Sequence, residues 1–203
     1  IDLRWGVKTN DLKVLEEREK LVLKVCLNEI KRSRPFFIAI LGDRYGWIPS
    51  INRFYSICDS LPEKERNLLT YGENKSVTEL EIFFGAIKAE VPVSHCLFYY
   101  RSEASYQNMD IETASKYRDA FSSLPDEEKA NRIKQLAELK TNIRSFCDAN
   151  DLRNNINEYT ISWKNGHFED LESWGNIVKD QLRKEIEEEL QTQEDTDSSE
   201  SNW

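Results

Sequence analysis

Two glutamates near the start of a predicted helix are the side chains whose type and spacing could do chemistry. Ser76 and Glu79 have the spacing of a capping box, in which each side chain bonds the backbone N–H of the other, so Glu79 has a structural role. Glu81 has no such role and stands between two aliphatic residues. A carboxyl group among apolar neighbours has a raised pKa, which is typical of functional sites. The alternative is a half-exposed surface glutamate that pairs with Lys88 or Lys75.

Two arginines, Arg4 and Arg44, each follow a predicted strand. If both project over the same edge of a sheet, their guanidinium groups could hold a phosphate or a carboxylate. The alternative is that each arginine pairs with a nearby acid, such as Asp2 or Asp43, and locks its own loop.

Three aromatic residues, Trp5, Tyr45 and Trp47, accompany these arginines. They could stack on a flat ligand, or they could pack the loop against a neighbouring helix. Gly42 and Gly46 predict a turn that needs backbone freedom. The sequence has neither a dinucleotide-binding glycine fingerprint nor a P-loop.

Composition narrows the class of protein. The chain has 203 residues, of which 39% are hydrophobic, enough for one sizeable core. A net charge of −9 argues against nucleic-acid binding, and no apolar run is long enough to span a membrane. The four cysteines and two histidines lack metal-ligand spacing, so we expect no metal site. Cys26 and Cys96 lie in apolar patterns typical of buried free thiols, which predicts a cytoplasmic protein.

Apolar periodicity predicts alternating strands and helices along the chain. The predicted strands are 1–5, 36–41, 95–100 and 157–163. The predicted helices are 13–33, 63–70, 76–89, 111–121, 126–149 and 168–190. Residues 48–75 are otherwise expected to be irregular, and Asn165-Gly166 is expected to turn the chain into the last helix.

This order of elements predicts an α/β fold, with a parallel sheet covered by helices on both faces. The run 36–41 is unbroken in its apolar character, so it is predicted to be a central strand buried on both faces. Because the chain opens inside an apparent strand, we expect the first strand and helix of the fold to be missing. We predict one domain over 1–190 and an acidic disordered linker or tail over 191–203.

Three segments together resemble a known family. They are Asp2-Leu-Arg-Trp-Gly6, Ser33-Arg-Pro-Phe-Phe-Ile-Ala-Ile-Leu-Gly-Asp-Arg-Tyr-Gly-Trp47 and Ser76-Val-Thr-Glu-Leu-Glu-Ile82. The family is the TIR-like domain of unknown function found at the front of NACHT or STAND-type ATPases with TPR or WD repeats. It includes nephrocystin-type and telomerase-associated-component-like proteins. The resemblance implies a flavodoxin-like fold.

The resemblance also implies two possible functions. Some TIR domains cleave NAD at the nicotinamide–ribose bond, and Glu81-Ile-Phe-Phe-Gly-Ala86 matches the position of their catalytic glutamate. A carboxylate suits that reaction because it can stabilise an oxocarbenium-like centre. In this interpretation Arg4, Trp5, Arg44, Tyr45 and Trp47 shape the ligand site, and NAD is a substrate rather than a cofactor.

Other TIR domains only bind one another or adaptor proteins. Our leading hypothesis is therefore a signalling module that acts by self-association or partner binding, joined to ATPase and repeat domains of the same chain. NAD cleavage by Glu81 is the alternative.

Overall fold

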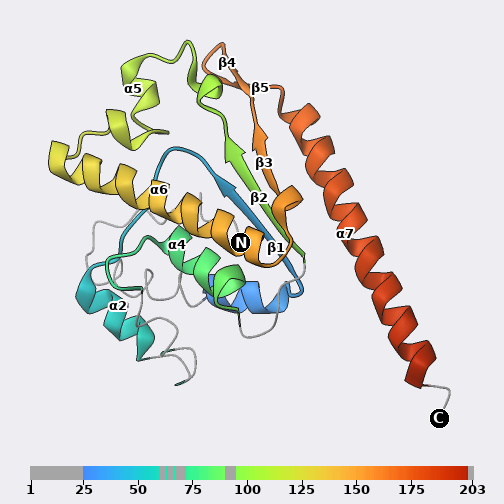
Figure 1. The fold of residues 1–203 in the computed structure, drawn as a ribbon. Coiled ribbons are helices and arrows are strands. Elements are labelled where there is room, and N and C mark those ends of the chain that lie inside the picture. The colour runs from blue at the N-terminus through green and yellow to red at the C-terminus, as the bar shows by residue number, and fades with distance from the viewer. Residues whose placement is uncertain (1–24, 60–62, 64–65, 67–71, 90–94, 201–203) are drawn as a thin grey trace.

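The structure, a computed structural model, describes residues 25–59, 63, 66, 72–89 and 95–200 (Figure 1). The predicted strand 1–5, with Arg4 and Trp5, lies outside the described residues. So does most of the predicted helices 13–33 and 63–70, although residues 25–32 are helical.

Three parallel strands form the main sheet: β1 (Phe36–Leu41), β2 (His95–Arg101) and β3 (Ile156–Tyr159). Their order is β1-β2-β3, and Phe36 stands beside His95 at the start of the first pair. The strands at 36–41 and 95–100 are therefore confirmed. The α/β class with a parallel sheet between helices is confirmed as well, and the arrangement is consistent with a flavodoxin-like fold.

One face of the sheet packs against α4 (Val77–Ile82) and α6 (Asp126–Ala149). The shared core contains alternate residues of β1 and β2 together with a helical stripe of α6, which comprises Leu136, Leu139, Ile143 and Cys147. The bounds of α6 are those that the sequence predicts. Its stripe follows the helical repeat, and three acidic residues in its first turn favour a helix start.

A π-helical turn, Phe83–Ile87, continues α4. Gly85 in this turn lies so close to β1 that a Cβ atom there would stand 2.3 Å from a ring carbon of Phe37. The glycine thus allows the helix to approach the strand.

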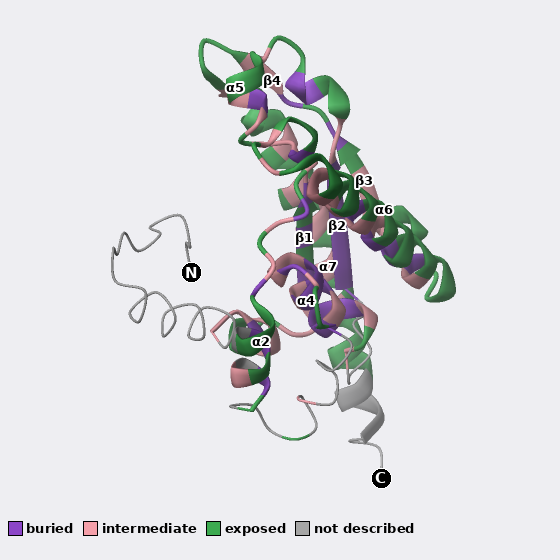
Figure 2. Cartoon of the chain, turned by 90° about the vertical axis from the view of Figure 1, so that its left-hand side faces the viewer, coloured by how far each residue is buried: buried purple, intermediate pink, exposed green. Residues whose placement is uncertain are grey.

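The opposite face of the sheet packs against α7 (Leu171–Glu200). Trp174 of α7 stacks on Tyr159 with ring centroids 4.4 Å apart and meets Tyr99 edge-on. Because α7 covers β2 and β3, β2 is buried along almost its whole length (Figure 2).

The prediction that 36–41 is buried on both faces is wrong. Ile38 and Ile40, on the face that α7 covers elsewhere, are 37% and 51% exposed. Within the described residues β1 pairs only with β2, so β2 is the central strand. The apolar run alone could not show this, because exposure depends on whether α7 reaches that face.

The connecting segments correct several boundaries. The region 48–75 contains α2 (Ile51–Cys58), and its Phe54 and Cys58 pack with Leu27 in a second core cluster. The predicted helix 111–121 is two short pieces, α5 (Ile111–Ala114) and a 3₁₀ turn, Asp119–Phe121. Two further 3₁₀ turns are Glu103–Tyr106 and Arg153–Asn155.

Asn165-Gly166 closes a β-hairpin instead of leading directly into a helix. Both residues have positive φ, and they join β4 (Ser162–Lys164) to antiparallel β5 (His167–Glu169). This pair of residues is the preferred two-residue hairpin turn.

Helix α7 continues past residue 190, where the sequence analysis ended it, so the segment 191–200 is helical rather than disordered. Side-chain bonds one turn apart support the extension: Thr192 bonds the Glu188 carbonyl, and Gln193 bonds the Glu189 carboxylate.

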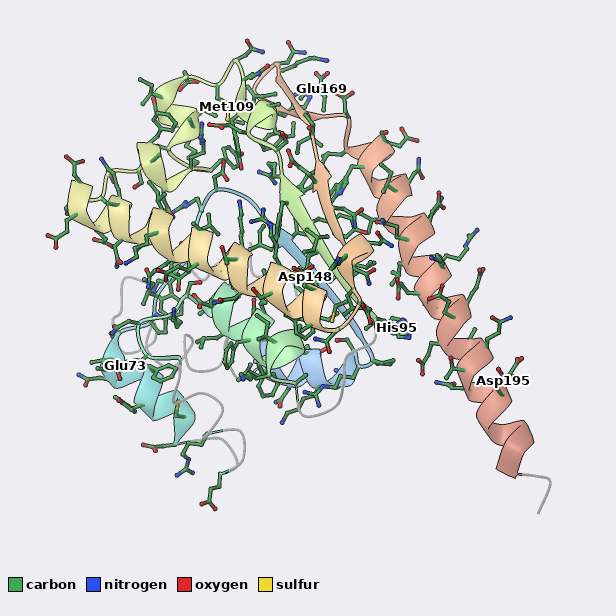
Figure 3. The ribbon with its side chains drawn as sticks, in the orientation of Figure 1. Glu73, His95, Met109, Asp148, Glu169 and Asp195 are labelled. Carbon is green, nitrogen blue, oxygen red and sulfur yellow. The ribbon has the colours of Figure 1, made fainter. Side chains whose placement is uncertain are left out.

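His95 joins the sheet to α7 (Figure 3). Its Nδ1 lies 2.7 Å from Glu185 Oε2 and its Nε2 lies 3.0 Å from Glu189 Oε2, while Phe36 stacks on the ring. A neutral imidazole can donate only one of these bonds, so the geometry favours the imidazolium form. Burial lowers the pKa of His95, but the two glutamates raise it by more, and the net shift is upward.

We expect the docking of α7 to depend on pH. The pKa of His95 is raised in the folded state, so the His95 contact stabilises the docking of α7 fully at a pH below the ordinary pKa of histidine. This stabilisation is lost as the pH rises through the pKa that His95 has in the folded protein. Hydrogen exchange in the second half of α7 should therefore be faster near pH 9 than near pH 6, after correction for intrinsic exchange. His95→Gln should remove this difference, whereas His167→Gln, which changes an exposed histidine, should retain it. Equal pH profiles in His95→Gln and the unmodified chain would contradict the assignment.

Candidate functional site

Glu81 lines a groove of about 540 Å³ beside β1. The groove lies between the helix at 25–32, β1 and α4, and its polar lining consists of Cys26, Glu29, Thr78 and Glu81. Burial raises the pKa of Glu81, and a hydrogen bond from the Cys26 thiol opposes part of that rise. Burial and the neighbouring Glu81 also raise the pKa of Cys26 to about 12, so this thiol stays protonated and can donate.

Neither lysine that the sequence offered as a partner binds Glu81. Lys75 lies 3.1 Å from Glu79 instead, and Lys88 forms no ion pair with a described residue. Glu81 is thus a carboxyl group of raised pKa in an open groove, next to a neutral thiol. Such a group can take up or release a proton at a higher pH than an ordinary glutamate can.

Tyr45 is fully buried and ties the loop after β1 to the start of α4. Its hydroxyl donates to Glu79 Oε2 and accepts a bond of 3.3 Å from the Ser76 N–H. Burial and the bond to Glu79 raise the pKa of Tyr45, so the phenol remains a neutral donor.

Only one of the two hydrogen bonds of the predicted capping box is therefore present. The Ser76 hydroxyl accepts from the Glu79 N–H at 3.2 Å, as expected. The hydroxyl of Tyr45 takes the place that the Glu79 carboxylate was expected to occupy at the Ser76 N–H. A residue more than thirty positions earlier in the chain thereby completes the cap.

Asp119 is a contact of the loop after β1 that the sequence does not predict. It is buried, its Oδ2 accepts from the Tyr45 N–H at 2.7 Å, and its Oδ1 lies 3.6 Å from Arg44 Nε. Arg44 also donates to the Lys116 carbonyl. Arg44 therefore holds its loop through Asp119 and not through Asp43, which was the expected partner. No local signal marks Asp119, because its partners lie over seventy residues away.

Trp47 lies in a second groove on the other side of this loop. The groove is mainly apolar, and its lining includes Trp47, Ile111, Phe121, Leu124, Arg44 and Arg132. Arg132 of α6 donates to the Gly46 carbonyl at 3.0 Å, and Gly46 has a φ of 98°. We call this surface the Trp47 groove.

Of the residues that were predicted to form one site, the structure describes Arg44, Tyr45, Trp47 and Glu81, and it does not bring these four together. Arg44 and Trp47 share the Trp47 groove, Tyr45 is enclosed in the core, and the described lining of the Glu81 groove includes none of the three. Within the described residues no cluster of three or more His, Cys, Asp or Glu side chains is placed to hold a metal ion. Nor does any described helix combine the length and apolar character that crossing a membrane requires.

The parallel sheet between helices defines an α/β protein, and comparison with known proteins places it in a family. Residues 2–191 match the family described as a domain of unknown function, DUF4062, so the chain belongs to that family. No solved structure matches the chain.

Two longer proteins are similar to the chain. Mouse telomerase protein component 1 is 33% identical over 145 residues, which cover 67% of the chain and 5% of that protein. Rat tetratricopeptide repeat protein 41 is 28% identical over 127 residues, which cover 52% of the chain and 10% of that protein. The chain thus spans only a small part of the length of these relatives.

Removing the Tyr45 hydroxyl should destabilise the fold. Tyr45→Phe leaves the Ser76 N–H and the Glu79 carboxylate buried without this partner, so we expect a loss of about 1–3 kcal/mol in the free energy of unfolding. Urea denaturation measures this change. Tyr55→Phe is the matched control, since Tyr55 also bonds a glutamate, Glu73, but at the exposed surface. A loss no larger than that of the control would contradict the role of Tyr45.

Proposed function

We propose that this chain is an interaction module of a larger protein and acts by self-association. The Trp47 groove carries the proposal. Trp47, Ile111 and Phe121 are 40%, 72% and 41% exposed, although large apolar side chains gathered at one surface groove are unusual on a monomer.

The chemistry of the groove is that of a protein-binding surface. Tryptophan and arginine are the residues that most often dominate the energy of such interfaces, and Arg44 and Arg132 lie beside Trp47. Both arginines are held in place, by Asp119 and by Glu128 respectively, so little side-chain entropy is lost on binding.

The acidic helix α7 of a second copy is the occupant that we favour. Its large exposed apolar residues are Leu171, Ile177, Ile186 and Leu190, and they are interspersed with glutamates. This pattern suits an apolar groove in which two arginines outnumber the one acidic residue, Glu112. A groove on one copy that binds a helix of the next makes a head-to-tail contact, which can extend into a ring or a filament. Such assembly agrees with a role as the signalling module of a NACHT or STAND-type ATPase, to which α7 would lead.

We expect the chain to associate in a concentration-dependent manner and Trp47→Ala to weaken that association at least tenfold. Sedimentation equilibrium on the 203-residue chain measures both, and added salt should weaken the contact between charged groups. Tyr55→Ala is the control, because it removes an exposed aromatic residue outside the groove.

Two results would contradict this proposal. One is a chain that stays monomeric at all concentrations, which would exclude self-association and mean that the groove binds a different protein. The other is equal association by the unmodified chain and Trp47→Ala, with melting temperatures showing that both are folded.

A second function, NAD cleavage by Glu81, is supported by one observation. The carboxyl group of Glu81 lies in a groove and has a raised pKa, as a residue involved in proton transfer or in stabilising positive charge often does. In this function the carboxylate would stabilise the oxocarbenium-like ribose as nicotinamide leaves.

NAD turnover by the full-length parent protein, forced to oligomerise, tests this function. Glu81→Gln should abolish turnover, whereas Glu29→Gln, which changes another carboxylate of the same groove, should retain it. The reaction needs the ionised carboxylate, so activity should fall as the solution is acidified. Because the pKa of Glu81 is raised, this fall should occur at a pH above 4.5, the ordinary pKa of glutamate. Equal turnover by Glu81→Gln and the unmodified protein would exclude the catalytic role.

A further inference from the structure

The edge of β1 that faces away from β2 is open within the described residues. In that part of the chain β1 pairs only with β2, so the backbone groups along its other edge have no strand beside them. The Glu81 groove runs along this edge, because the consecutive residues Phe37, Ile38, Ala39 and Ile40 all line it. Side chains of a strand point alternately to its two faces, so a groove that meets four in a row follows the edge. An edge of this kind is a template for a further strand.

The two faces of the sheet differ in chemistry beside this edge. On the face of α7, Ile38 and Ile40 are exposed. On the face of α4, Glu29 and Glu81 line the groove, and its described lining contains no basic residue. A strand that fits this edge therefore carries apolar side chains on one face and a cation on the other.

The connections of the sheet show on which side of β1 a preceding strand belongs. The crossovers from β1 to β2 and from β2 to β3 carry α4 and α6 on the same face of the sheet. The helix at 25–32, which leads into β1, lies on that face too, because Leu27 packs with Leu80 and Ile30 lies against Gly85. Crossovers between parallel strands are almost always right-handed, so those with helices on one face move in one direction across the sheet. A strand joined to β1 through this helix therefore lies on the side away from β2.

We propose that residues 1–5, Ile-Asp-Leu-Arg-Trp, pair with the open edge of β1 as a parallel strand. The segment is the predicted strand that precedes the helix leading into β1. Residues 6–35 connect it to β1, and this length exceeds the roughly one dozen residues that a crossover between parallel strands needs.

The alternation of side chains in this segment matches the two faces of the edge. Its apolar residues are Ile1, Leu3 and Trp5, which share one face of a strand, and Asp2 and Arg4 share the other. Burial of apolar surface places the first set beside the exposed isoleucines of β1. Arg4 then lies on the face of Glu29 and Glu81 and supplies the cation that the described lining of the groove lacks.

The test is nuclear Overhauser spectroscopy on the isotope-labelled 203-residue chain. We expect backbone contacts between residues 1–5 and β1, in the pattern of parallel strands. The amides of β1 that point away from β2 should also exchange slowly with solvent, because the added strand binds them. A mixture of labelled and unlabelled chains separates contacts within one chain from contacts between copies. Contacts between copies would assign the edge to a second copy and overturn the proposal.

Arg4→Glu should raise the exchange rate of these outer amides at least about tenfold, because it places a further carboxylate beside Glu29 and Glu81. Lys8→Glu is the matched control, since it makes the same change of charge between the predicted strand and the predicted helix, and it should leave the rate unaltered. The amides of β1 that bond β2 should stay protected in both variants, which shows that the sheet is intact.

Two results would overturn the pairing. One is the absence of backbone contacts between residues 1–5 and β1, and the other is fast exchange along the outer edge of β1 in the unmodified chain. Equal exchange rates in Arg4→Glu and Lys8→Glu would overturn the placement of Arg4 beside the two glutamates.

Discussion

The hydroxyl of Tyr45 is the contact on which the arrangement of both grooves depends. It joins the loop after β1 to the first turn of α4, where it completes the cap that Ser76 begins and bonds the buried Glu79 carboxylate. The backbone N–H of the same tyrosine is bound by Asp119, which fastens the loop to the segment before α6. A buried polar network is favourable only when its members are satisfied, so one side chain holds three segments of the chain together.

This network explains why the side chains of the loop 42–47 do not all face one site in the described structure. Tyr45 turns inward to cap α4, while Gly46, with its positive φ, lets Trp47 turn towards α5 and α6. A pocket at the carboxyl edge of the sheet is lined by the end of β2, by Glu158 of β3, by the loop at 118–120 and by α6, and Asp43 is the only residue that the loop 42–47 contributes to it.

Different kinds of interaction hold the helices on the two faces of the sheet. On one face, α4 and α6 pack through aliphatic side chains and through Gly85, which permits close approach. On the other face, α7 combines aromatic stacking at Trp174 with the charged contact of His95 to two glutamates. Packing of the first kind is insensitive to pH, whereas the second depends on the protonation of one imidazole.

The sequence by itself determined the features that rest on local patterns. Periodicity placed β1, β2 and α6, the Ser76 cap marked the start of α4, and the motif around Trp47 pointed to the family that the match over residues 2–191 shows. Local patterns also gave two wrong predictions. The apolar run of β1 does not reveal that Ile38 and Ile40 are exposed, and the acidic composition of 191–200 predicted disorder where α7 continues. Only the tertiary structure decided which side chains meet. Asp119 lies far from Tyr45 in the chain, and His95 lies far from Glu185, so their proximity follows from how the chain folds around the sheet.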